Sequence, residues 1–155
     1  MQISKRPITK LALTNQGALD LVFLGVGSAF SKTLNQTNLF IVKGQTHLLV
    51  DCGNHCPHSL FHDYNTQLTD IDNFLITHSH ADHVGGLEEA QLAGRYVKKR
   101  KPTMIITRAY EKILWEQSLR GGAEASEAVP LKFNDLWNVI RPRKLNTFRR
   151  DTFET

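Results

Sequence analysis

The residues best able to do chemistry lie in one short segment, Thr77-His78-Ser79-His80-Ala81-Asp82-His83-Val84-Gly85-Gly86. It places three histidines and an aspartate within residues 78–83. Neutral imidazole and carboxylate are ligands that zinc and its first-row neighbours accept. His78 and His80 are two residues apart, so both rings project to the same side of an extended segment. We therefore predict that this segment is a metal-binding loop.

The flanking sequence indicates how the loop is held. An apolar run, Phe74-Leu75-Ile76, precedes it, and we predict a strand over Asn73–Ile76. Asp82 and His83 are adjacent, so a turn into a following helix is needed to aim both side chains at one cavity. The two glycines that follow leave room for that turn and for backbone passing close to a metal. A single histidine is more often a hydrogen-bonded structural residue, but four potential donors at the end of a strand make chance a poor explanation.

The loop and the glycines after it resemble the signature of a known family. The stretch from His78 to Gly86 resembles the His-x-His-x-Asp-His-x-Gly-Gly signature of the metallo-β-lactamase-fold hydrolases. That resemblance implies an α/β fold, the N-terminal portion of an αβ/βα sandwich with a mixed sheet and flanking helices. It implies one or two divalent metal ions, with zinc expected first and manganese or iron as alternatives.

The resemblance also implies a role for each donor. His78 and His80 match ligands of the first metal, and Asp82 and His83 match ligands of the second. Metal-bound hydroxide would be the attacking group, and Asp82 would be the catalytic residue that holds or accepts the proton of the water.

An aspartate upstream of the loop belongs to the same pattern. We predict a hairpin from Leu39–Val42 and His47–Val50, which runs into Asp51-Cys52-Gly53. This end resembles the Asp-x-Gly motif of the family, and it implies that Asp51 is an outer carboxylate that orients the ligand loop. The alternative is that Asp51 caps the helix that follows.

The segment Leu24-Gly25-Val26-Gly27-Ser28-Ala29-Phe30 bears on the substrate. It resembles the Leu-Gly-Thr-Gly-Ser-Ala segment of the RNase Z-type nucleases and related phosphodiesterases. This favours a phosphodiester substrate, either RNA or a small molecule. Ester, thioester, lactone and β-lactam hydrolysis stay open because the same hydroxide attacks any of them. A different class, a non-catalytic metal-binding or dimerising module, also stays open.

The ligand set is incomplete by the standard of the family. The resemblance implies a third histidine, a bridging aspartate and a final histidine downstream, but none of the seven histidines lies after His83. Asp135 and Asp151 are the downstream aspartates, and neither lies in a recognisable motif. Either residues 1–155 are a single domain that is incomplete at its C-terminal end, or a partner chain, such as the second copy in a homodimer, or a reduced ligand set completes the site.

The composition of the chain limits the classes of protein to which it can belong. The chain has 155 residues, of which 41% are hydrophobic and 22% charged, values typical of one globular domain. No apolar run approaches the length of a membrane span, and no signal-type segment follows the basic start, so we expect a cytoplasmic protein without a membrane partner. Cys52 and Cys56 are too few for a disulfide scaffold. We expect them to be thiols near the rim of the site, with a small zinc knot as the alternative.

Basic residues form two clusters in a chain of net charge +4. They are Arg95, Lys98, Lys99, Arg100 and Lys101, and Arg141, Arg143, Lys144, Arg149 and Arg150. Such runs are usually solvated faces or helix ends. A nucleic-acid-binding module is the alternative, although Tyr96 is the only ring in the first cluster.

The other expected elements follow from turn signals and periodicity. They are a hairpin of Ile8–Thr14 with Leu19–Leu24 around Asn15-Gln16-Gly17, a helix over Pro57–Asn65, a helix over Leu87–Val97 stopped by Pro102, a strand over Thr103–Thr107, a helix over Tyr110–Leu119 ended by Gly121-Gly122, and a short element over Phe133–Ile140. His55, His58 and His62 are expected at the surface or the rim of the site.

Overall fold

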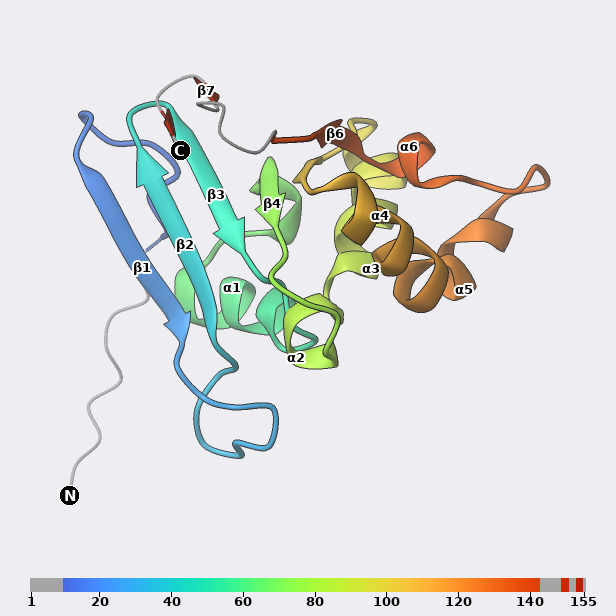
Figure 1. Ribbon diagram of the computed structural model, residues 1–155. Helices are drawn as coiled ribbons and strands as arrows, with labels where there is room; N and C mark the ends of the chain where they lie inside the picture. Colours follow the sequence, from blue (N-terminus) through green and yellow to red (C-terminus); the bar gives the residue numbers. More distant parts are fainter. Residues whose placement is uncertain (1–9, 143–148, 151–152, 155) are drawn as a thin grey trace.

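The computed structural model describes residues 10–142, 149–150 and 153–154. Within them, the chain forms a mixed six-stranded sheet in the order β1-β2-β3-β4-β5-β6, with β1 at one edge and β6 at the other (Figure 1). The strands are β1 (Leu19–Gly25), β2 (Asn38–Lys43), β3 (Thr46–Val50), β4 (Asn73–Leu75), β5 (Thr103–Ile105) and β6 (Asn138–Ile140). A separate antiparallel pair joins β7 (Arg149–Arg150) to β8 (Phe153–Glu154).

Helices connect the strands and cover the core. The longer ones are α1 (Cys56–Tyr64), α3 (Leu87–Ala93), which continues as the π-helical turn η2 (Gly94–Lys98), and α4 (Arg108–Leu114), which continues as the π-helical turn η3 (Trp115–Leu119). The shorter ones are α2 (Ala81–Val84), α5 (Arg120–Ala123), α6 (Phe133–Leu136) and the 3-10 turns η1 (Leu68–Asp70) and η4 (Glu124–Ser126). The expected α/β class, a mixed sheet with flanking helices, is confirmed.

The hairpin of β2 and β3 forms as predicted. Lys43 pairs with Thr46, which leaves Gly44 and Gln45 as the loop. Gly44 has φ +59°, a left-handed conformation that glycine adopts without steric cost. Phe40 and Leu49 are fully buried, so the inner face of this hairpin belongs to the core.

The hairpin predicted before it is wrong. Residues 10–14 form no strand, and β1 pairs antiparallel with β2 instead, from Leu19 opposite Lys43 to Phe23 opposite Leu39. Asn15 does not close a turn between two strands, because its side chain accepts the N–H of Gly44 at 2.7 Å and is tied to the β2–β3 turn. A long apolar partner strand therefore outweighs a local turn signal. Ile8 and Thr9 lie outside the described residues.

The central strands run parallel and end at one edge of the sheet. Leu75 of β4 pairs with Val50 of β3 on one side and Ile105 of β5 on the other. The segments that leave the three strands therefore begin side by side. Ligand sites in α/β proteins lie in the crevice outside such carboxyl ends, so this edge is where functional side chains are expected.

Large side chains fill the space between the sheet and the helices. Phe74 of β4 meets Trp137 edge to face, with ring centroids 5.4 Å apart. The indole N–H of Trp137 donates to Oε1 of Gln91 at 2.9 Å. Both Gln91 and Trp137 are almost completely buried, so this bond satisfies two polar groups inside the core.

The helices on the C-terminal side correct two expectations. The helix that follows Thr107 does not end at Gly121-Gly122, since both glycines lie within α5. The atoms nearest to a Cβ at Gly122 belong to the flexible carboxylate of Glu88 on α3, against which α5 packs. The strand over Thr103–Thr107 is shorter than predicted, because Thr107 becomes the N-cap of α4 and accepts the N–H of Tyr110.

The first basic cluster is largely neutralised by acids. Arg95 pairs with Glu127, Lys98 with Asp70 at 3.0 Å, and Arg100 with Asp72. These contacts favour a solvated, ion-paired face over a nucleic-acid surface. In the second cluster Arg141 binds Glu111, and the structure does not describe the side chains of the other members. Within the described residues, no helix combines the length and apolar character needed to cross a bilayer.

Candidate active site

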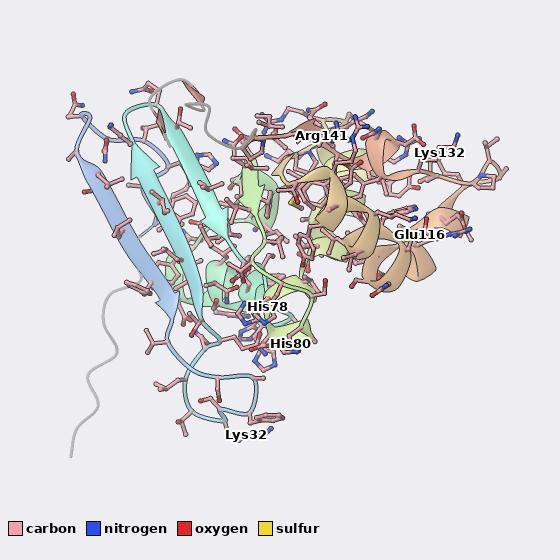
Figure 2. All side chains as sticks on the ribbon, in the orientation of Figure 1. Lys32, His78, His80, Glu116, Lys132 and Arg141 are labelled. Carbon is pink, nitrogen blue, oxygen red and sulfur yellow. The ribbon has the colours of Figure 1, made fainter. Side chains whose placement is uncertain are left out.

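The predicted metal-binding loop lies at the carboxyl end of β4. After Leu75 the chain bends at Thr77 and continues without regular secondary structure to His80, which has φ −70° and ψ 150° and is the N-cap of α2. Helix α2 begins at Ala81, so the turn that we predicted for aiming Asp82 and His83 is present. Figure 2 shows His78 and His80 together at this end of the sheet, next to α2.

The three imidazole rings of the loop are gathered. The ring centroids of His78 and His80 lie 4.6 Å apart, and those of His78 and His83 lie 3.9 Å apart. Nε2 of His78 lies 3.0 Å from Nδ1 of His80, so both rings do project to the same side. Oδ2 of Asp82 lies 3.4 Å from Nε2 of His83. All four side chains thus occupy one small volume at the edge of the sheet.

Asp51 lies beneath these rings and is buried. It follows β3 directly, and its backbone N–H donates to the carbonyl of Leu75 at 2.8 Å. Its carboxylate accepts the N–H of Thr77 at 2.8 Å and the hydroxyl of Thr77 at 2.8 Å. The same carboxylate lies 2.7 Å from Nδ1 of His83. The helix cap that was the alternative role for Asp51 is instead His55.

This network assigns the tautomers of two imidazoles. Because a carboxylate only accepts, Nδ1 of His83 must carry the proton that it shares with Asp51. The Thr77 hydroxyl donates to Asp51, which leaves its oxygen to accept from Nδ1 of His78 at 3.0 Å. In the neutral form of either ring, the proton therefore lies on Nδ1 and Nε2 is the nitrogen left to bind metal.

Backbone contacts hold the Asp51-Cys52-Gly53 segment against α2. The N–H of Cys52 donates to the carbonyl of His83 at 2.8 Å, and the N–H of Gly86 donates to the carbonyl of Cys52 at 2.9 Å. A Cβ atom on Gly53 would lie 2.2 Å from the carbonyl oxygen of Asp82. A Cβ atom on Gly86 would lie 2.7 Å from the Cys52 sulfur. Both positions therefore need glycine. Gly53 packs against the backbone of Asp82, and Gly86 packs against Cys52 and Gly53.

The two cysteines lie under the site as buried, free thiols. The hydrogen bond with Cys56 and the burial of both groups raise the pKa of the Cys52 thiol well above its usual value. Both thiols are buried in the core, and within the described residues they belong to no group of three donors that could hold a metal ion, so they act as packing elements. On the other side of the loop, the hydroxyl of Ser79 lies 2.9 Å from that of Tyr110, and burial raises the pKa of Tyr110.

The loop suits a metal ion in donor type but is not a complete site. Two imidazole nitrogens 3.0 Å apart can share one ion, because each bonds zinc at about 2.0 to 2.1 Å. Within the described residues, however, no three His, Cys, Asp or Glu side chains form a group that could hold a metal ion. The loop therefore fits as part of a ligand set.

Sequence reasoning singled out only the first residues of the second wall of the site, residues 28–30. A cavity of about 860 Å³ lies between residues 80–82 of the loop and residues 28–36, the connection from β1 to β2. Two buried amides that we had not singled out lie at this end of the connection, Gln36 in the cavity lining and Asn38 at the start of β2. Oδ1 of Asn38 accepts the N–H of Gly53 at 2.9 Å. Among the rim histidines, His55 lines the cavity, while His58 and His62 are exposed on α1.

The fold and this loop define a protein of the metallo-β-lactamase fold. The structure of the metallo-β-lactamase-fold protein YhfI from Bacillus subtilis superposes with a TM-score of 0.63 at 16% identity, covering 86% of this chain and 49% of that one. A diphosphatase of the PhnP family superposes with a TM-score of 0.54 at 15% identity, covering 84% of this chain and 53% of that one.

Within that fold, the chain belongs to the anti-Pycsar protein Apyc1 family, whose model matches residues 19–155. The Apyc1 protein of Bacillus phage BSP38 is 41% identical over 128 residues, which cover 81% of this chain and 48% of that relative. The Apyc1 protein of Paenibacillus sp. (strain J14) is 39% identical over 122 residues, covering 79% and 49%. The chain thus spans about half the length of the curated relatives it matches.

Proposed function

We propose that this chain carries the histidine-rich part of a metal-dependent hydrolase that cleaves phosphodiester bonds. One observation carries the proposal. The buried carboxylate of Asp51 fixes the proton on Nδ1 of His83 and, through Thr77, on Nδ1 of His78. In the neutral form of both rings this leaves each Nε2 as the nitrogen that can bind an ion, which is the arrangement that outer partners give to metal-ligating imidazoles.

The residues of the loop would divide the work as follows. His78, His80, Asp82 and His83 would hold one or two divalent ions, with further ligands from a longer chain or a partner chain, a second copy included. A bound ion would lower the pKa of water to about 7 and polarise the phosphoryl oxygen. Asp82 lines the cavity, and its Oδ2 would accept the proton of the attacking water. Asp51 would keep the imidazoles in the required tautomer throughout.

One feature supports a phosphodiester as the substrate. The segment Leu24–Phe30, which resembles that of RNase Z-type nucleases, leads into the cavity wall opposite His80 and Asp82. The relatives are named for an action against Pycsar, so we extend that role to this chain. RNase Z-like cleavage of RNA and hydrolysis of small phosphodiesters both fall within the proposal, and hydrolysis of other esters is the neighbouring alternative.

A second candidate is a non-catalytic metal-binding or interaction module. The observation that favours it is the lack, within the described residues, of any three donors that could hold an ion. A chain of this kind would bind metal through two imidazoles and release it readily. It would hydrolyse none of the ester classes.

Turnover of bis-para-nitrophenyl phosphate separates the two candidates. We expect hydrolysis that stops with a chelator and returns with zinc or manganese, and a loss of about 100-fold or more in His80→Ala, since losing only an outer partner costs 10- to 100-fold. His62→Ala is the matched control, because His62 is exposed on α1 and outside the cavity lining. Metal uptake without hydrolysis of phosphodiesters, thioesters or lactones would support the second candidate. Turnover indifferent to both chelator and His80→Ala would contradict the first.

A further inference from the structure

We propose that the connection between β1 and β2, residues 26–37, positions the substrate, with Lys32 binding its anionic group and Phe30 contacting its planar or apolar group. The proposal rests on the proposed function for the reaction itself, but it makes a separate claim about binding. Figure 2 shows Lys32 on this connection, at the same end of the molecule as His78 and His80.

The cavity places this connection opposite the metal-binding loop. Residues 28–36 form one wall, and His80, Ala81 and Asp82 form the other. Its volume of about 860 Å³ lies within the range of small-molecule sites, about 300 to 1,000 Å³. A molecule that reaches His80 and Asp82 from this cavity must therefore pass along residues 28–36.

The base of the connection is fixed by buried polar contacts. Gln36 is buried, and its Nε2 donates to Oδ1 of Asn54 at 2.8 Å while its Oε1 accepts the N–H of His55 at 3.2 Å. The N–H of Gly27 donates to the carbonyl of Asn35 at 2.8 Å. These bonds tie both ends of the connection to each other and to the segment that carries Asp51. The base of the connection is thus fixed beside the segment that supports the metal-binding loop.

The tip presents side chains that the fold itself does not use. Phe30 is 86% exposed, so its ring gains almost nothing from the core. Lys32 is exposed and, within the described residues, has no ion-pair partner, whereas Arg95, Lys98 and Arg100 all pair with acids. An exposed ring two residues from an unpaired cation, on the wall of a cavity, is suited to a ligand with a flat group and a negative charge.

Electrostatics gives Lys32 a specific task. Asp82 on the opposite wall repels an anionic substrate, and the chain offers an ammonium group on the near wall to offset that repulsion. The ammonium group of Lys32 can follow the ligand because its stem is flexible. Its role is therefore in binding, and removing it should change KM far more than kcat.

Two phosphate diesters test the two contacts separately. Bis-para-nitrophenyl phosphate carries a charge and two rings, whereas dimethyl phosphate carries the charge alone. For Lys32→Ala we expect affinity for both probes to fall about tenfold, as for a lost hydrogen bond to a charged group, with kcat changed less than about twofold. For Phe30→Ala we expect about a fivefold loss for the ring-bearing probe and no change for dimethyl phosphate. Lys32→Arg and Phe30→Tyr should restore binding.

Matched controls and an independent readout keep the result interpretable. Lys112→Ala removes an exposed cation from α4, and Phe61→Ala an exposed ring from α1, both outside the cavity lining. Affinity is measured by NMR titration as well as from KM, so it does not depend on turnover. Predicted shifts in affinity without any turnover would support this inference and defeat the proposed function.

Three results would overturn the inference. The first is turnover that depends on His80 while KM is unchanged in Lys32→Ala and Phe30→Ala, which leaves the proposed function standing. The second is a fall in kcat with unchanged KM in either variant. The third is the absence of measurable binding of both probes.

Discussion

The two walls of the cavity are built in opposite ways. The wall that carries His80 and Asp82 is held from below by the carboxylate of Asp51 and by backbone bonds to Cys52. The facing wall, residues 28–36, is bonded at its base through Gln36 and presents exposed side chains at its tip. The first wall therefore rests on buried contacts, whereas the tip of the second, around Phe30 and Lys32, is exposed.

This contrast separates two physical requirements. Donor atoms around an ion must be placed to within a few tenths of an ångström, so their support is buried and rigid. Side chains that meet a ligand must first be exposed to it, so they contribute little to folding. Substitutions in the first wall should therefore cost stability, and substitutions at the tip of the second should cost binding alone.

Gly53→Ala should have the largest effect on the first wall. The new Cβ would lie 2.2 Å from the carbonyl oxygen of Asp82, and backbone cannot move aside cheaply. We expect a loss of about 3 kcal/mol in the free energy of unfolding, measured by urea denaturation. Gly121→Ala is the control, because nothing lies within 4 Å of a Cβ there and the position is helical, so it should be neutral or slightly stabilising.

Asp51→Ala should have the next largest effect. It leaves the N–H of Thr77 and Nδ1 of His83 without their acceptor, which costs about 2 to 3 kcal/mol of unfolding free energy. Asp72→Ala removes a half-exposed carboxylate paired with Arg100 and should cost no more than about 1 kcal/mol. Equal losses in the two variants would show that the wall is not held by Asp51.

Gln36→Ala should cost about 1 kcal/mol, because it removes two hydrogen bonds at the base of the second wall. The exchange of backbone amide hydrogens should accelerate in residues 26–37 and stay unchanged in residues 77–86. Faster exchange in both segments would mean that the two walls form one unit.

The contact between His47 and Asp72, at the start of β3, should make the stability of the fold depend on pH. Burial lowers the pKa of His47, whose Nε2 accepts the N–H of Asp72 at 2.9 Å and must be unprotonated to do so. Since the unfolded state binds the proton more tightly, stability is complete above about pH 6.5 and falls as the pH drops toward the lowered pKa. Urea denaturation at several pH values should show this slope, and His47→Gln should flatten it. An unchanged slope in His47→Gln would contradict this assignment.

Phe30→Ala and Lys32→Ala should have the smallest effects on folding, each within about 0.5 kcal/mol, because both side chains are exposed. Thermal unfolding of the two variants beside the parent chain measures this. A larger loss would mean that the tip is part of the folded frame rather than a surface for ligand.

The sequence was most informative where the candidate functional residues are close together in the chain. The loop from His78 to His83 could be predicted because its donors are neighbours in the chain and follow an apolar strand. Asp51 could be placed through its motif. Gln36 and Asn38 could not, because an amide in a polar stretch looks the same whether or not it bonds to Asn54 or Gly53, which are distant in the sequence.

The wrong predictions about the fold have the same origin. The turn signal at Asn15–Gly17 is local. The pairing of β1 with β2 instead joins two strands that residues 26–37 separate in the sequence. Gly121-Gly122 resembles a helix end, yet both glycines lie inside α5, which packs on α3. Local patterns predict elements well, and contacts between distant segments decide where those elements begin, end and pair.

The most direct test of the account is the coordination of metal by this chain. We predict that zinc or manganese binds with imidazole nitrogen in its first shell by X-ray absorption spectroscopy, that His80→Ala removes this signal, and that His62→Ala retains it. Metal bound with the same spectrum in His80→Ala, or no metal bound by the parent chain, would contradict the claim that residues 78–83 are a metal-binding loop.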